Sequence, residues 1–122
     1  LCALIGILCA TSVHGADLKD AEKAIVENTI RAELRDPDSA RFGWLPLAGT
    51  QPEKYCGIVN SRNGFGGYAG DAPYSVFLFW KDNSLLLAAV IQIGTADWAS
   101  PESQAVQVTC REWGYTDLSR TK

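Results

Sequence analysis

The chain has 122 residues, of which 47% are hydrophobic and 20% are charged, and its formal net charge is −3. This length suits one compact domain, and the hydrophobic content is unlike that of a disordered chain. The 14 acidic against 11 basic residues exclude a broadly basic surface, so no nucleic-acid partner is expected.

The N-terminal segment has the pattern of a secretory signal peptide. Residues 1–10 carry no charge and are almost all apolar, small residues follow, and the charges begin at Asp17. An apolar stretch that ends in small residues is typical of a cleaved leader. We therefore predict a leader at residues 1–16, cleaved after Gly15 or Ala16. A buried helix or a retained anchor is the alternative, although the stretch is short for a membrane span.

Removal of this leader leaves residues 17–122 as a single predicted α+β domain in the periplasm or outside the cell, without a membrane span. Only two cysteines then remain, Cys56 and Cys110. An even pair in an oxidising compartment predicts one disulfide between them. Two separate buried thiols are the alternative.

An amphipathic helix is predicted over residues 17–35, because apolar residues recur there at steps of three and four. Asp17 or Asp20 is the expected cap. Pro37 ends the helix, because its ring disfavours a helical conformation at the preceding residue. A single turn capped by Asp36 is expected to follow.

Short β-branched and aromatic stretches next predict an antiparallel sheet of three to five strands. The candidate strands are residues 42–47, 55–60, 74–80 and 85–93, and residues 81–84 connect the last two as a hairpin. Both hairpin strands are apolar on both faces, which is typical of central strands covered on each side. The alternative is an exposed face through which two copies form a homodimer.

A C-terminal helix is predicted to begin with Ser100 as its cap, followed by Pro101, and to end at Gly114. A strand is the competing interpretation, because residues 106–108 alternate and are β-branched. With the helix preferred, the fold is α+β: an N-terminal helix, an antiparallel sheet, and a C-terminal helix tied to the sheet by the disulfide.

Two motifs carry a resemblance to a known family. They are LRDPDSARF at residues 34–42 and CGIVNSRNGFGGYAG at residues 56–70. Together they resemble an uncharacterised family of small exported bacterial proteins, marked by L-K/R-D-P-D-S-A-x-F and C-G-x-V-N-x-x-N-x-x-G-G-Y-x-G. The resemblance covers roughly residues 20–80. It implies an exported, single-domain protein, and it transfers no activity and no catalytic residue.

The second motif contains the candidate recognition site. Glycines free the backbone amides, asparagines hold tight turns, and a tyrosine offers a ring face and a hydroxyl, which together suit a sugar or a peptide. The alternative is a purely structural connection, with Phe65 and Tyr68 fixing it to the core. The candidate binding residues are Asn60, Asn63, Gly66, Gly67, Tyr68 and Trp98.

Catalytic chemistry has little support in the chain. Without the leader there is no histidine, which removes the commonest general base and zinc ligand, and Gly-x-Ser-x-Gly is absent. We predict no catalytic residue, no metal site and no cofactor. The enzymatic alternative is a carboxylate pair that acts on glycosides. Its candidates by residue type are Asp36, Asp38, Asp71, Asp82, Asp97 and Glu102.

The residues therefore favour an exported, non-enzymatic binding module whose partner is an unidentified protein or another component of the cell envelope. A carbohydrate-active enzyme and a homodimeric structural subunit of the envelope are the alternatives.

Overall fold

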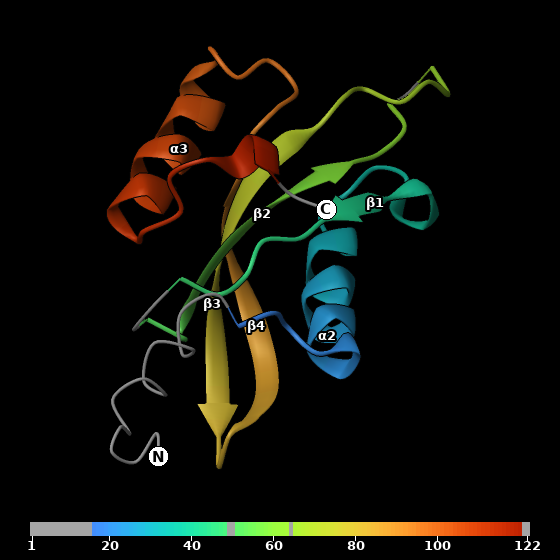
Figure 1. Cartoon of the computed structure of the whole chain (residues 1–122). Coiled ribbons are helices and arrows are strands. Elements are labelled where there is room, and N and C mark those ends of the chain that lie inside the picture. Colours follow the sequence, from blue (N-terminus) through green and yellow to red (C-terminus); the bar gives the residue numbers. More distant parts are fainter. Residues whose placement is uncertain (1–15, 49–50, 64, 121–122) are drawn as a thin grey trace.

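The computed structural model describes residues 16–48, 51–63 and 65–120, and in it two helices lie on opposite sides of a four-stranded antiparallel sheet (Figure 1). The predicted α+β fold is thus confirmed. The strands, in their order across the sheet, are β1 (Arg41–Gly43), β2 (Lys54–Asn60), β3 (Ala72–Lys81) and β4 (Ser84–Ile93). The helical elements are α2 (Asp20–Arg31), η2 (Pro37–Ser39), α3 (Pro101–Glu112) and η3 (Leu118–Arg120). The predicted leader lies outside the described residues, apart from Ala16.

Helix α2 is shorter than the predicted helix over residues 17–35. Its cap is Lys19, whose backbone N–H donates to Glu22 Oε1 over 2.8 Å, so the prediction of an aspartate cap was wrong. The helix ends at Arg31, before Pro37. The backbone hydrogen bonds that follow join residues three apart in the chain instead of four, so the α-helical pattern stops there. Its apolar stripe is predicted correctly, and it buries Val26 and Ile30 completely.

Strand β1 ends at Gly43, whereas the sequence predicted a strand over residues 42–47. The reason is that the Tyr55 side chain makes the hydrogen bonds that a neighbouring strand would otherwise make. Tyr55 Oη accepts from the backbone N–H of Leu45 over 2.8 Å and donates to its carbonyl over 2.7 Å. The backbone polar groups of Leu45 are therefore satisfied without a strand ladder.

The β3–β4 hairpin turns more tightly than predicted. Lys81 and Ser84 pair directly, so the connection has two residues rather than four. Those residues, Asp82 and Asn83, have φ values of +52° and +66°, as a turn whose twist matches the flanking strands requires.

Of the two hairpin strands, only β3 is central, because β4 forms the edge of the sheet. The expectation that both hairpin strands are covered on each side was therefore wrong. Exposed apolar side chains remain on the hairpin: Phe77, Phe79, Leu86, Leu87 and Ile91. We call these five residues the hairpin patch.

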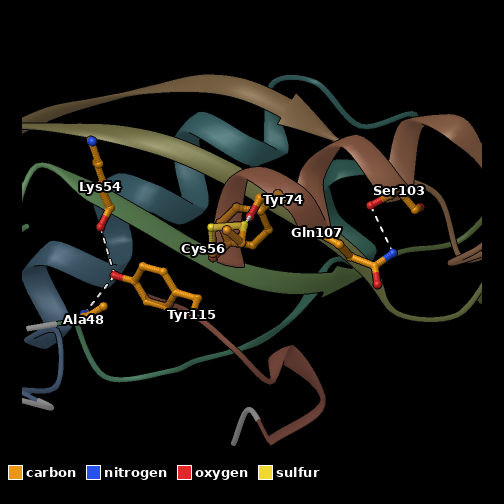
Figure 2. Close-up of a disulfide and its surroundings, with 8 residues drawn as sticks. Ala48, Lys54, Cys56, Tyr74, Ser103, Gln107 and Tyr115 are labelled. Atoms are coloured by element: carbon orange, nitrogen blue, oxygen red, sulfur yellow. Dashed lines mark hydrogen bonds between the residues drawn. A yellow bond between two sulfur atoms is a disulfide. The ribbon is translucent and has the colours of Figure 1, made fainter. Parts of the chain in front are cut away.

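Helix α3 begins as predicted: Ser100 Oγ accepts from the backbone N–H of Ser103. Gly114 follows the helix with a φ of +99°, a conformation that favours glycine, and the competing strand interpretation was wrong. The predicted disulfide is also present. It joins Cys56 of β2 to Cys110 of α3, and both residues are fully buried (Figure 2).

Tyrosine side chains fill much of the remaining core. Tyr55 and Tyr74 are fully buried, and the ring of Tyr115 meets that of Tyr55 edge-on. Tyr115 Oη donates to the Lys54 carbonyl and accepts from the Ala48 N–H, and so joins the C-terminal segment to the sheet (Figure 2). In contrast, Tyr74 Oη is buried without a hydrogen-bond partner among the described residues. Within the same residues, neither α2 nor α3 has the length and apolar character of a membrane-spanning helix.

Candidate functional site

Residues 60–70, which run from the last residue of β2 almost to the start of β3, are here called the glycine-rich loop. Asn63 organises its turn: its Oδ1 accepts from the backbone N–H of Phe65 over 2.8 Å and from that of Gly67 over 3.3 Å. The Asn63 N–H in turn donates to the Gly67 carbonyl over 2.8 Å. Gly66, which has a φ of +87°, lies inside this turn.

The base of the loop is closed by the other predicted asparagine. Asn60 Oδ1 accepts from the Gly70 N–H over 3.0 Å, and Gly70 has a φ of +113°. Both asparagines therefore bond the backbone, as predicted. Because their Oδ1 atoms are already used within the loop, they fix its shape rather than offer these acceptors to a ligand.

Tyr68 connects the two sequence motifs in space. Its Oη donates to the Ser39 carbonyl over 2.9 Å, and Ser39 Oγ accepts from the Arg62 N–H over 2.8 Å. Ser39 ends the η2 turn of the first motif, while Tyr68 and Arg62 belong to the second. The half-buried Tyr68 ring thus fixes the loop against the rest of the molecule, as the structural alternative expected.

Two arginines lie against the Tyr68 ring. The Cζ atom of Arg41 is 3.9 Å from the ring centroid, and that of Arg62 is 5.7 Å from it. Both are cation–π distances. Sequence reasoning did not select these arginines, because they are brought to the ring by the pairing of β1 with β2 and by the fold of the loop.

Phe65 is where the sequence expectation fails. The structural alternative has Phe65 fixing the loop to the core, yet Phe65 is 98% exposed. The glycines on either side carry no side chains for it to pack against, and its backbone is held in the turn that Asn63 organises. The signal in the sequence was a large apolar residue between two glycines in a turn.

Trp98 does not join the glycine-rich loop directly, although it was predicted with that group. It lies between β4 and α3, and its Nε1 donates to the Asp71 carbonyl just beyond the loop, over 2.8 Å. Its half-buried ring lines a small groove of about 150 Å³ together with Gln107 and Arg111. The groove is too small for more than a fragment of a drug-sized ligand.

The candidate carboxylates are distributed over separate elements. Asp36 precedes η2, Asp82 lies in the hairpin turn and Glu102 in the first turn of α3. Asp97 Oδ1 accepts from the Ala99 N–H, which is a local turn role. Among the described residues, no three acidic, cysteine or histidine side chains form a group that suits a metal ion.

Comparisons of the chain with protein-family models, with curated proteins and with solved structures find no match in any of the three. The resemblance carried by the two motifs therefore stays a prediction.

Proposed function

We propose that this chain is an exported, non-enzymatic binding module that holds a partner protein through the glycine-rich loop. The observation that carries the proposal is Phe65, which is 98% exposed on a loop held by the bonds of Asn63 and Asn60. Exposed aromatic side chains on ordered loops are typical anchors of protein interfaces. The leader-like pattern of residues 1–16 supports export, and the Cys56–Cys110 disulfide is compatible with an oxidising compartment.

Substitution of Phe65, the predicted anchor, is expected to affect partner binding without affecting the fold. Phe65→Ala is expected to weaken partner capture by about 30-fold or more, because burying a phenylalanine in a partner contributes about 2 kcal/mol or more. The melting temperature stays within a few degrees, because the side chain packs against almost nothing in the free protein. Affinity capture from envelope extract, with quantified mass spectrometry of the retained proteins, measures the difference between wild type and variant.

Val108→Ala is the matched control for this experiment. Val108 is also exposed, but it lies on α3, away from the loop. Two results contradict the loop as the binding site. In one, Phe65→Ala captures as much partner as wild type does; in the other, Val108→Ala loses as much capture as Phe65→Ala does.

The hairpin patch favours a second function, that of a homodimeric subunit. Its five side chains expose between 38% and 57% of their surfaces. At about 200 Å² for a fully exposed large side chain, they present roughly 450 Å². One side of a standard interface covers about 800 Å², a little over half of it apolar. Phe79 pairs with Leu87, so these two side chains lie on the same face of the hairpin as Phe77. Leu86 and Ile91 lie at the two register shifts of the hairpin. The summed exposed area of the five is close to the apolar share of one protomer's interface.

Sedimentation velocity over a range of concentrations tests the dimer. We expect wild type to dimerise and Leu87→Lys to remain a monomer, because a lysine there buries an unpaired charge in the interface. Val108→Lys places the same charge on α3 and leaves the dimer intact. A wild-type protein that stays monomeric at high concentration rules this function out.

A further inference from the structure

We propose that Arg41 and Arg62, held at the ring of Tyr68, form a binding site for carboxylate side chains in an acidic segment of the partner protein. The inference rests on the proposed function for the nature of the partner, and it deepens that function by naming what the partner presents. The site takes one arginine from β1 and one from the glycine-rich loop.

The first support is that the donors of both arginines are unused. A guanidinium group carries five N–H donors in a planar fork. Within the described part of the chain, neither Arg41 nor Arg62 donates a side-chain hydrogen bond or forms an ion pair, and both are exposed. Arg31 shows the contrasting structural role, since it pairs with Glu27 over 3.3 Å and donates to the Pro37 carbonyl over 2.6 Å.

The second support is that the Arg41 guanidinium group and the Arg62 backbone are positioned before any ligand arrives. Arg41 lies over a ring that is itself tethered by its hydroxyl to the Ser39 carbonyl. The backbone of Arg62 is held by Ser39 Oγ and by its bridge to Tyr68. Side chains that are already ordered lose less conformational entropy on binding, so more of the interaction energy appears as affinity.

The chemistry of the ligand follows from the guanidinium fork and from its surroundings. Arginine matches planar carboxylates with two parallel hydrogen bonds, and these charge-assisted bonds are about twice as strong as neutral ones. The protein has a net charge of −3, so two arginines that form no ion pair within the described residues are unusual on a chain that is negative overall. Phe65 lies in the same loop as Arg62, and its exposed ring offers the same partner an apolar contact. A partner protein that presents carboxylates next to an apolar pocket therefore matches both the two arginines and Phe65.

Titration with an acetylated hexaglutamate peptide, followed by NMR of the arginine Nε–Hε signals, tests the site. We expect the signals of Arg41 and Arg62 to shift saturably, while hexaglutamine leaves them in place. Arg41→Gln combined with Arg62→Gln is expected to weaken binding by about tenfold or more. Arg111→Gln, which removes an exposed arginine on α3, leaves the affinity unchanged.

Three outcomes overturn the inference. One is no shift at Arg41 and Arg62, and another is an equal shift at every exposed arginine, which indicates charge attraction alone. The third is tighter binding of inorganic phosphate or sulfate than of hexaglutamate, which assigns the site to phosphate or sulfate esters instead.

Partner capture separates this inference from the function on which it rests. Capture that is lost in Phe65→Ala but kept in the double arginine variant overturns the carboxylate site alone. Capture that survives Phe65→Ala overturns the loop as the anchor, whatever the peptide titration shows.

Discussion

Replacing Cys56 and Cys110 together by alanine is expected to lower the free energy of unfolding by up to about 4 kcal/mol. The disulfide spans 54 positions of the chain, and it restricts the unfolded state because it closes that long loop. It is also the covalent link between the sheet and α3. A loss of this size is comparable with the whole net stability of a small domain, so the variant is expected to be partly unfolded at physiological temperature.

Urea unfolding of the oxidised and the reduced wild-type protein measures the same effect without a change of sequence. Intact mass after alkylation under non-reducing conditions first verifies that no free thiol is present in the oxidised sample. The single variant Cys56→Ala is the matched control, because it breaks the bond and leaves Cys110 buried. A loss below about 1 kcal/mol on reduction contradicts the chain-entropy account.

Alkaline unfolding is the second large effect that we expect, and it comes from three buried tyrosines. Burial raises the pKa of Tyr115 to about 12, and it raises the pKa values of Tyr55 and Tyr74 further above their usual value. Below about pH 10 all three are protonated in the folded and the unfolded chain. Above it, the unfolded chain loses these protons while the folded chain keeps them, so stability falls as the pH rises. Each tyrosine contributes at most about 1.4 kcal/mol per pH unit, so the three together give a slope of up to about 4 kcal/mol per unit near pH 11, where the unfolded tyrosines are mostly ionised and the folded ones are mostly protonated.

Urea unfolding at a series of alkaline pH values, with tyrosinate absorbance as a second signal, measures this slope. Tyr74→Phe is the matched variant, because the Tyr74 hydroxyl has no hydrogen-bond partner among the described residues. Its removal is expected to reduce the slope by about a third. At neutral pH the variant is as stable as wild type or more stable, since an unsatisfied buried hydroxyl is removed. A stability that stays constant from pH 10 to pH 12 contradicts this account.

The glycine-rich loop shows how far local sequence reasoning reaches. Asn60 and Asn63 bond the backbone as predicted, because an asparagine side chain and its target amide lie only a few residues apart. The structural alternative places Phe65 against the core, and this is wrong. Whether a loop residue is buried depends on what lies opposite it, and that is decided by distant parts of the chain.

The contact of Arg41 and Arg62 with the Tyr68 ring could not be predicted from the local sequence. Arg41 and Arg62 are 21 positions apart, and nothing local to either indicates that both will lie against Tyr68. Their meeting requires the β1–β2 register, which pairs Arg41 with Asn60, and the link from Ser39 to the loop. Long-range pairing of this kind is set by the sheet as a whole.

The sequence by itself determined the elements whose cause is local: the apolar stripe of α2, the Ser100 cap of α3 and the hairpin. It also predicted the disulfide, because only two cysteines follow residue 16 and no choice of pairing remains. Only the tertiary structure decided that β4 is an edge strand and that Phe65 is exposed to solvent. It also decided that β1 ends at Gly43, because the Tyr55 hydroxyl bonds the backbone that follows. Periodicity, capping and turn formation act over a few residues, whereas strand order and exposure depend on contacts between residues far apart in the chain.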